Sequence, residues 1–311
     1  MAKIVVVGSL ITDISIYSSR LPVAGETALG QTLSFGLGGK GNNQATAASR
    51  AGAEVIMVGK IGRDSLGQTI LEHYKREGMT ARYITVSDRA DTGAAAIEID
   101  TLSGQNRIIV VKGANAELSR EDVRAAQAEL ETCDAVLTQL ESSLESVEEA
   151  KALALRYGRL FVLNPAPFQP IPDDLFRGVD YLTPNETEAE FFTGIPVEDA
   201  SQAKKAAGRL LEMGVKNVII TLGSRGAYFY NGREELLIEP PDAKPVDTTG
   251  AGDAFNGGLT VALSEGIPVE AALRFANCVA ALSIMSKGSS ASMPKREQAD
   301  ALLKKWYPIQ P

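Results

Sequence analysis

Residues 246–258 read Val-Asp-Thr-Thr-Gly-Ala-Gly-Asp-Ala-Phe-Asn-Gly-Gly, a glycine-rich turn that runs into the helical pattern of Ala254 to Ser264. Gly250 and Gly252 permit tight backbone geometry at this junction. The free amide groups at the start of a helix, together with the positive end of its dipole, attract anions. We therefore expect Gly250, Ala251 and Gly252 to bind a phosphoryl group.

Asp253 closes this turn and is the candidate catalytic residue. Its carboxylate would lie beside a transferring phosphoryl group, where it can act as the general base for an attacking hydroxyl. Taken alone, an Asp at this position is more often a helix N-cap. The phosphate-binding turn around Asp253 favours the catalytic role.

The rest of the chain alternates short apolar runs with longer helical patterns, which is typical of an open, mostly parallel sheet covered by helices. The predicted strands are Ile4 to Val7, Val55 to Val58, Ala135 to Leu140, Leu160 to Leu163 and Val218 to Leu222. The predicted covering helices are Ser65 to Glu77, Ser119 to Glu131, Leu144 to Tyr157, Asp199 to Met213 and Val269 to Ser286.

Two stretches interrupt this alternation. Ser9 to Gly36 and Asp91 to Lys112 contain alternating Thr-rich and Ile-rich segments with Gly and Pro but no convincing helix. We expect them to pair as one small β subdomain, a lid over the edge of the main sheet. The predicted division is therefore a catalytic α/β domain of residues 1–8, 37–90 and 113–311, with a lid of residues 9–36 and 91–112.

Composition and motifs exclude several classes of protein. The net charge of −8 over 311 residues argues against a nucleic-acid partner. No apolar run is long enough for a membrane span, no export signal is recognisable, and two cysteines do not suggest a disulfide framework, so we expect a cytoplasmic protein without a membrane partner. The P-loop motif is absent, and Gly8 lacks the glycine spacing of a dinucleotide-binding turn.

A second glycine-rich segment, Gly36-Leu-Gly-Gly-Lys-Gly-Asn-Asn-Gln44, opens into a small-residue helix predicted at Ala45 to Ala51. Gly38 and Gly39 would let a ligand approach the main chain. Asn43 offers both donor and acceptor groups suited to sugar hydroxyls. Lys40 is explained either as a ligand contact or as a solvated surface charge.

These two segments, Gly38-Gly-Lys-Gly-Asn-Asn43 and Asp247-Thr-Thr-Gly-Ala-Gly-Asp253, resemble the signatures of the ribokinase-like carbohydrate kinases, also called the PfkB family. The resemblance extends along nearly the whole chain through Gly25-Glu-Thr27, Gly113-Ala-Asn115, Gln139-Leu-Glu141, Asn164-Pro-Ala-Pro167, Thr183-Pro-Asn-Glu-Thr-Glu188 and Thr221-Leu-Gly-Ser-Arg-Gly226. It implies a three-layer α/β/α domain with a small, discontinuous β-sheet lid. It also implies an enzyme that phosphorylates the 5-hydroxyl of a pentose with ATP.

The resemblance also implies the roles of individual residues. Asp253 would be the base, and Gly250, Ala251 and Gly252 would form the anion hole. The sugar would meet residues of the first glycine-rich segment and of the first strand's end: Ile11, Thr12, Asp13, Gly39, Lys40, Gly41, Asn42, Asn43 and Glu141, together with Asp253. The nucleotide would lie beside Asn185, Thr221, Leu222, Gly223, Ser224, Arg225, Gly226, Gly252, Asp253 and Asn277.

Metal ions and a partner subunit follow from the same resemblance. Asn185 and Glu188 match the family's Asn-x-x-Glu element, in which the Glu organises Mg²⁺ through water. Alternatively, Glu188 lies on a solvated helix face. Potassium, an activator in this family, would lie near Asp247, Thr249, Ser283, Ser286, Gly288 and Ser292. The family's lid also tends to mediate a homodimer.

Ile11 departs from the family pattern. Ribokinases usually read Gly-Ser-x-Asn-x-Asp after the first strand, whereas this chain reads Gly8-Ser-Leu-Ile-Thr-Asp13. An apolar residue there would favour a sugar that lacks one hydroxyl, as in related deoxyribose kinases, so D-ribose and 2-deoxy-D-ribose are both expected substrates. Alternatively, Ile11 only packs at the junction with the lid.

Other functions remain as alternatives: another small sugar, a nucleoside or a sugar phosphate as the substrate, or a silent sugar sensor with the same fold. The single histidine, His73, lies on a predicted helix far from both glycine-rich segments and is expected to be structural. Cys133 and Cys278 are expected to be small apolar core residues.

Overall fold

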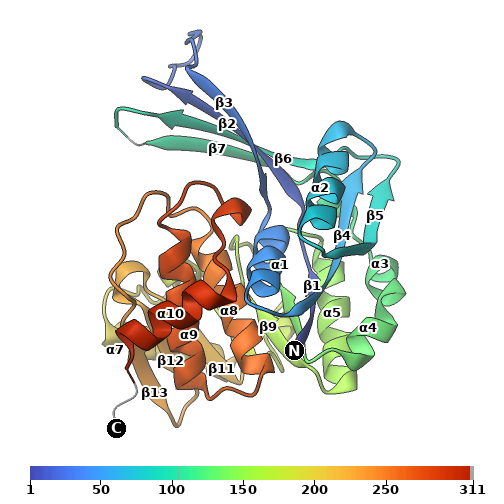
Figure 1. Ribbon diagram of the computed structural model, residues 1–311. Helices are drawn as coiled ribbons and strands as arrows, with labels where there is room; N and C mark the ends of the chain where they lie inside the picture. Colours follow the sequence, from blue (N-terminus) through green and yellow to red (C-terminus); the bar gives the residue numbers. More distant parts are fainter. Residues whose placement is uncertain (104, 309–311) are drawn as a thin grey trace.

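The computed structural model of the chain describes residues 1–103 and 105–308, so positions 309–311 of the predicted catalytic domain lie outside the described residues. Its main sheet has nine strands in the order β13-β12-β11-β10-β9-β8-β1-β4-β5 (Figure 1). The neighbours from β11 to β5 are parallel, whereas β12 and β13 are antiparallel additions at one edge. The strands are β1 (Lys3–Val7), β4 (Glu54–Gly62), β5 (Thr80–Ser87), β8 (Ala135–Thr138), β9 (Leu160–Leu163), β10 (Tyr181–Leu182), β11 (Asn217–Thr221), β12 (Ala227–Tyr230) and β13 (Glu235–Ile238).

Helices cover both faces of this sheet, because its central strands β1, β8 and β9 are apolar and buried on both sides. One core layer joins the sheet to α1 (Lys40–Arg50), α2 (Ser65–Arg76), α8 (Ala251–Ser264), α9 (Val269–Ser283) and α10 (Arg296–Trp306). The other joins it to α3 (Arg120–Ala125), α4 (Gln127–Thr132), α5 (Leu144–Tyr157), α6 (Glu186–Thr193) and α7 (Ala200–Glu212). The predicted α/β/α class is confirmed.

A separate sheet of four strands, here called the small sheet, projects from the main body (Figure 1). Its strands lie in the order β3-β2-β6-β7 and comprise β2 (Ile11–Ser18), β3 (Thr32–Gly38), β6 (Gly93–Asp100) and β7 (Asn106–Val111). The two segments that the sequence analysis assigned to one β subdomain therefore meet through the parallel pair β2 and β6.

Several predicted boundaries differ from the structure. The helix expected at Ser119 to Glu131 is two short helices, because the chain turns at Ala126. The helices expected from Ala45 and Ala254 begin earlier, at Lys40 and Ala251, so each glycine-rich segment already contributes its first helical turn. Three short strands, β10, β12 and β13, were missed, as was the longer β5.

Among residues 1–103 and 105–308, no helix is both long and apolar enough to cross a bilayer.

Candidate active site

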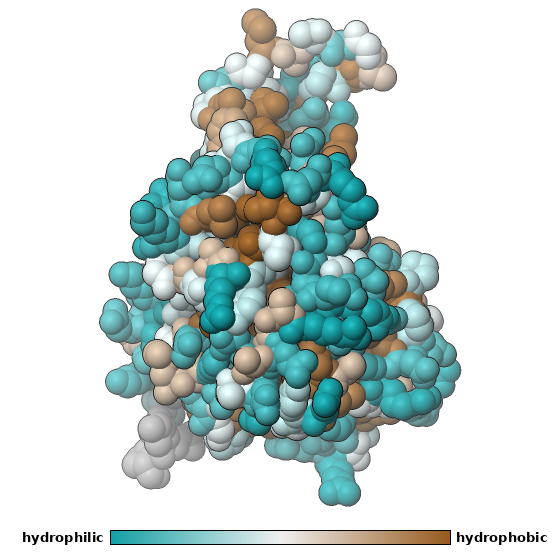
Figure 2. All heavy atoms as spheres, turned by 90° about the vertical axis from the view of Figure 1, so that its right-hand side faces the viewer, coloured by the Kyte–Doolittle hydropathy of each residue, from teal (hydrophilic) through white to brown (hydrophobic). Residues whose placement is uncertain are grey.

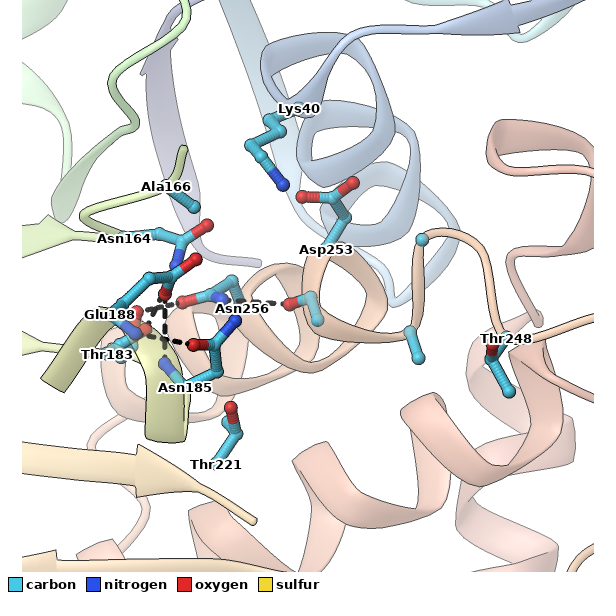
Figure 3. A pocket seen from close by; sticks show the side chains of 13 residues that line it. Lys40, Asn164, Ala166, Thr183, Asn185, Glu188, Thr221, Thr248, Asp253 and Asn256 are labelled. Atoms are coloured by element: carbon cyan, nitrogen blue, oxygen red, sulfur yellow. Dashed lines mark hydrogen bonds between the residues drawn. The ribbon is translucent and has the colours of Figure 1, made fainter. Parts of the chain in front are cut away.

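A cleft of about 170 Å³ lies at the carboxyl ends of the central strands, beside the start of α8 (Figure 3). Ligands of open parallel sheets bind at this edge, where strand order reverses. In this sheet the order reverses between β1 and β8, and the lining residues Asn164, Thr183 and Thr221 lie at the carboxyl ends of the nearby β9, β10 and β11. The residues that line the cleft are Lys40, Asn164, Ala166, Thr183, Asn185, Glu188, Thr221, Thr248, Gly250, Ala251, Gly252, Asp253 and Asn256.

The first turn of α8 forms one wall of the cleft. Gly250 is the N-cap and has a φ of 80°, a left-handed conformation that favours glycine. The first bond of the helix runs from the Ala254 amide to the Gly250 carbonyl at 2.8 Å, and the Ala251 amide reaches Thr248 O at 3.2 Å. The amides of Gly252 and Asp253 lie in the first turn of α8, where an amide has no carbonyl partner within the helix, so they are suited to bind an anion.

Asp253 is not the helix N-cap, so that explanation from the sequence is wrong. Its carboxylate is 5% exposed and accepts two side-chain hydrogen bonds from consecutive residues of α1. Asn43 Nδ2 donates to Oδ2 and Gln44 Nε2 donates to Oδ1, each at 2.9 Å. The two glycine-rich segments, more than 200 residues apart in sequence, therefore meet at this carboxylate.

A chain of buried amides continues from Gln44 through the cleft. Gln139 Nε2 donates to Gln44 Oε1 at 2.7 Å, and Gln44 Nε2 also reaches Asn164 Oδ1 at 3.1 Å. Asn164 Nδ2 in turn donates to Thr183 O at 2.9 Å. Buried amides with these partners lock one another's orientation, and so fix the direction of the Asp253 carboxylate.

Lys40 and Glu141 are two further charged residues near the Asp253 carboxylate. The Lys40 amide and Ser9 Oγ both donate to Glu141 Oε2, at 2.8 and 2.6 Å. Burial lowers the pKa of the Lys40 ammonium, but the carboxylates of Asp253, Glu141 and Glu188 together raise it above its usual value. Its side chain extends toward Asp253 in Figure 3. Lys40 is thus a charged residue of the cleft rather than a surface lysine.

Asp13 lies on β2 at the joint of the small sheet. Its Oδ2 accepts a hydrogen bond from Ser289 Oγ at 3.1 Å. Burial raises the pKa of this carboxyl to about 6; the Ser289 hydrogen bond opposes the shift, whereas Glu141 and Asp253 add to it. A Cβ on Gly38 would lie 2.3 Å from Asp13 Oδ1, so glycine at that position leaves room for the carboxylate.

Asn185 and Glu188 form a capping box at the start of α6. Glu188 Oε2 accepts the Asn185 amide at 2.9 Å, and Asn185 Oδ1 accepts the Glu188 amide at 2.8 Å. Glu188 is 6% exposed and lines the cleft, which excludes a solvated helix face. Burial raises the pKa of its carboxyl, and Asn185 and Lys40 oppose this shift.

The predicted nucleotide residues divide into two groups. Thr221 lines the cleft and pairs with Asn185 in an isolated β-bridge. The turn Gly223–Arg225, which includes Ser224, follows Thr221 in the chain and ends at Gly226. Arg225 is bonded to Glu186 at 3.3 Å, whereas Leu222 is buried in the core. Asn277 is not among the lining residues; its Nδ2 donates to Ile238 O at 3.0 Å.

The predicted potassium residues come from two loops that meet. Asp247 accepts the amides of Thr249 and Gly288 at 3.0 and 2.9 Å. Burial raises the pKa of Asp247, but these two amides outweigh it and hold the pKa below its usual value. Ser283 and Ser292 are buried and bond to backbone carbonyls of Ala280 and Ser289, whereas Ser286 is exposed.

Of the ten predicted sugar residues, only Lys40 and Asp253 are among those that line the cleft. Ile11 is 3% exposed and shares a strand face with Asp13, and a Cβ on Gly93 would come within 3.2 Å of it. Thr12 is on the other face of β2 and lines a different cavity. Asn42 is buried, with neither amide atom hydrogen-bonded among the described residues. Gly39 and Gly41 pack on the backbone of residues 8–11.

Some functional candidates carried no role in the sequence analysis. Gln44, Asn164, Thr183 and Asn256 join the Asp253 wall to the rest of the cleft, and Asn256 Nδ2 donates to Gly252 O at 2.8 Å. Gln44 directly follows the segment Gly38–Asn43. Asn164 and Thr183 each begin a segment that resembles the family, but neither was given a role there. Their sequence signal was a polar residue at the end of a strand or within a small-residue helix.

Comparisons with known proteins bear on this site. A model of the pfkB family of carbohydrate kinases matches residues 1–296. The ribokinase of Haemophilus influenzae is 40% identical over 293 residues, which cover 94% of this chain and 95% of that protein. The deoxyribokinase of Salmonella typhimurium is 35% identical over 301 residues, 96% and 98% of the two chains. The structure of Arabidopsis thaliana ribokinase complexed with ribose and ATP superimposes with a TM-score of 0.91 at 35% identity, over 98% of this chain and 99% of that chain.

Proposed function

This chain belongs to the pfkB family of carbohydrate kinases, and from that premise we propose that it transfers the γ-phosphoryl group of ATP to the 5-hydroxyl of D-ribose or 2-deoxy-D-ribose. The products are the pentose 5-phosphate and ADP. The observation that carries the proposal is the Asp253 carboxylate, which two α1 amides hold beside the first turn of α8.

The residues of the cleft divide the reaction between them. Asp253 accepts the proton of the 5-hydroxyl as its oxygen bonds to phosphorus, and the bond to the ADP oxygen breaks. The Gly252 and Asp253 amides stabilise the charge on the transferring group, as does the ammonium of Lys40. Asp13, Asn43 and Glu141 supply acceptors and donors for the other sugar hydroxyls.

The charges of the cleft fit magnesium held mainly through water and phosphate. Among residues 1–103 and 105–308, no three His, Cys, Asp or Glu side chains lie close enough to form a cage of their own. Mg²⁺ commonly takes one or two carboxylates and completes its shell with water and substrate phosphates. Glu188 is a buried carboxylate that lines the cleft, so it would hold the ion, which neutralises phosphate charge when bound.

Potassium is proposed for the paired loops at Asp247 and residues 283–292. Hydrogen bonds join these loops, because Asp247 Oδ2 accepts the Gly288 amide and Ile284 O accepts the amides of Val246 and Asp247. The Asp247 carboxylate and backbone carbonyls of the two loops would supply the oxygen ligands of the ion. Two buried free cysteines, Cys133 and Cys278, have thiols whose pKa burial raises to about 11 and about 12. Unreactive thiols of this kind accord with the reducing cytoplasm that we propose for the protein.

Asp253→Asn tests the mechanism. Since a positioned base contributes roughly 10²–10⁴-fold, turnover should fall by about that factor while pentose binding, measured by calorimetry, is retained. Coupled ADP release with a panel of pentoses, nucleosides and sugar phosphates gives the rate. Normal turnover in the variant, or a preference for a substrate other than a pentose, contradicts the proposal.

Ile11 decides between the two pentoses. Loss of a hydrogen-bonding side chain costs a hydroxylated sugar about 1–3 kcal/mol, or roughly ten- to a hundred-fold in kcat/KM. We expect 2-deoxyribose to compete well with ribose, and Ile11→Asn to raise kcat/KM for ribose alone. A strong ribose preference in the unaltered protein shows that Ile11 serves packing only.

A further inference from the structure

A second cavity lies outside the active-site cleft, at the joint between the small sheet and the body. Its volume is about 670 Å³, against about 170 Å³ for the cleft, and falls in the range of small-molecule sites. The small sheet contributes Thr12, Phe35, Gly36 and Leu37. The body contributes Arg50, Ser65, Leu66, Thr69, His73, Arg76, Glu77, Ser290 and Ala291.

The cavity follows one face of α2. Residues 65 to 76 of this helix span about 16 Å at 1.5 Å per residue, so the cavity is an elongated groove. Leu37, Leu66 and Ala291 make part of its surface apolar, and Phe35 stands at its side with 61% of its surface exposed. A flat apolar group would be desolvated on these side chains.

Charge and unpaired polar atoms give the groove a direction. Arg50 is neutralised by a bidentate pair with Glu77, at 3.0 and 2.8 Å. Arg76 is exposed and forms no ion pair within residues 1–103 and 105–308. The net charge of the lining is therefore positive toward the C-terminal end of α2.

Two buried side chains in the lining lack partners. Thr12 is 1% exposed and His73 is 7% exposed, and neither Thr12 Oγ1 nor His73 Nε2 is hydrogen-bonded in the described structure. The pKa of His73 is lowered below its usual value, mainly by burial; Glu77 opposes this shift, and Arg50 and Arg76 add to it. The imidazole is therefore neutral at pH 7. An unsatisfied buried polar atom destabilises the protein, and a ligand with hydrogen-bonding groups would remove part of this penalty.

The groove is connected to the pentose site by hydrogen bonds. Ser290 Oγ donates to Leu37 O at 2.7 Å, so the two sides of the groove are tied together. The adjacent Ser289 Oγ reaches the same carbonyl at 2.9 Å and Asp13 Oδ2 at 3.1 Å. A ligand that moved the small sheet against this loop would change the position of Asp13.

We propose that this groove is a second, regulatory site for a small amphipathic anion with a flat apolar body and one carboxylate, sulfonate or phosphate group. The apolar body lies on Leu37, Leu66 and Ala291, and the anionic group meets Arg76. Its occupancy fixes the joint of the small sheet and changes the affinity for the pentose. This second part of the inference rests on the proposed kinase function, whereas binding in the groove does not.

Fluorescence titration with 8-anilinonaphthalene-1-sulfonate tests the binding directly, with ADP present to keep the probe out of the nucleotide cleft. We expect one saturable site per chain. Thr69→Trp, which fills the groove, and Arg76→Glu should each weaken binding at least tenfold. Gln68→Trp, on the neighbouring face of α2, and Arg233→Glu, on the β12–β13 hairpin, are the matched controls and should leave it unchanged.

Kinase assays then test the regulation. In the unaltered protein, the probe should change the pentose KM at least threefold, and Thr69→Trp should remove this effect while keeping the basal rate. A probe affinity that is unchanged in both Thr69→Trp and Arg76→Glu overturns the proposed site. A change of molecular mass in Thr69→Trp or Arg76→Glu also overturns it, because a second copy of the chain would then occupy the groove. Binding without any change in KM overturns the regulatory role alone.

Discussion

At the scale of single residues, Gln44 Nε2 donates a hydrogen bond to Asp253 Oδ1, and Gln44 Oε1 accepts one from Gln139 Nε2. We predict that Gln44→Ala lowers kcat roughly 10- to 100-fold with little change in pentose KM, because a carboxylate displaced by about 1 Å is a poor base. Gln139→Ala, one bond further away, should lower kcat less. Steady-state kinetics of both variants measure the difference, and equal losses, or a rise in KM alone, would mean that Gln44 serves packing.

Asp13 shows a conflict between stability and function. Burial raises the pKa of its carboxyl from 3.8 to about 6, so the charged form is disfavoured in the folded protein. The resulting destabilisation is present above about pH 6 and disappears below about pH 4. Asp13→Asn should therefore stabilise the fold at pH 7 by up to about 3 kcal/mol, with the gain lost by pH 4, and should weaken pentose binding.

Thermal unfolding at pH 7 and pH 4 measures this effect. Asp88→Asn is the control, because Asp88 is an exposed carboxylate paired only with Arg63. It should leave the melting temperature nearly unchanged at both values. A loss of stability in Asp13→Asn at pH 7 would contradict the assignment of a costly buried charge.

The sequence predicted the residues of the site where a motif names them and failed where only packing decides. Asp253, Lys40 and Glu188 do lie in one cleft. The N-cap alternative for Asp253 could not be excluded beforehand, since Gly250 takes the cap only because its φ is positive. Thr12 and Asp13 are adjacent in sequence, yet the alternation of a strand sends them to opposite faces.

At the scale of elements, the packing of α1 on α8 sets the distance from Asn43 and Gln44 to Asp253. A Cβ on Gly257 would lie 2.5 Å from Ala47 Cβ, so Gly257→Ala should force the helices apart and destabilise the protein by about 1–3 kcal/mol. Kinase activity should fall with it. Denaturant unfolding gives the stability, and an unchanged midpoint would show that the helices yield freely.

Two other helical glycines make this test specific. A Cβ on Gly208, in α7, meets nothing within 4 Å, so Gly208→Ala should stabilise the fold by about 0.5–1 kcal/mol without affecting catalysis. A Cβ on Gly252 also meets nothing, but this residue faces the cleft. Gly252→Ala should therefore reduce turnover at nearly unchanged stability.

Element boundaries were less predictable than element types. The strands β1, β4, β8, β9 and β11 are continuous apolar runs and were found. The central β10 has only two residues, and β12 and β13 lie at an edge where antiparallel pairing needs only short segments. The start of α1 at Lys40 depends on Gly39, which has a positive φ and on which a Cβ would lie only 2.9 Å from the Ile11 amide nitrogen. Such tertiary contacts are not visible in local periodicity.

At the scale of the whole molecule, the small sheet has an apolar outer face, opposite Asp13. Leu33, Ile109 and Val111 share this face through the pairings of β3, β2, β6 and β7, and each is 57–70% exposed. Figure 2 shows apolar side chains on the sheet at the top of the molecule. Contiguous exposed apolar surface of this kind marks a protein interface.

A homodimer through this face is therefore our prediction for the assembly, because a two-fold contact between identical faces buries both at once. Ile109→Lys places two like charges near each other in that contact and should give a monomer in analytical ultracentrifugation. The small sheet is then held only at its base, so the pentose KM should rise while the main body keeps its melting temperature. Leu155→Lys, on α5 and 42% exposed, is the control and should remain dimeric. A monomeric unaltered protein, or a dimer that survives Ile109→Lys, would place the contact elsewhere.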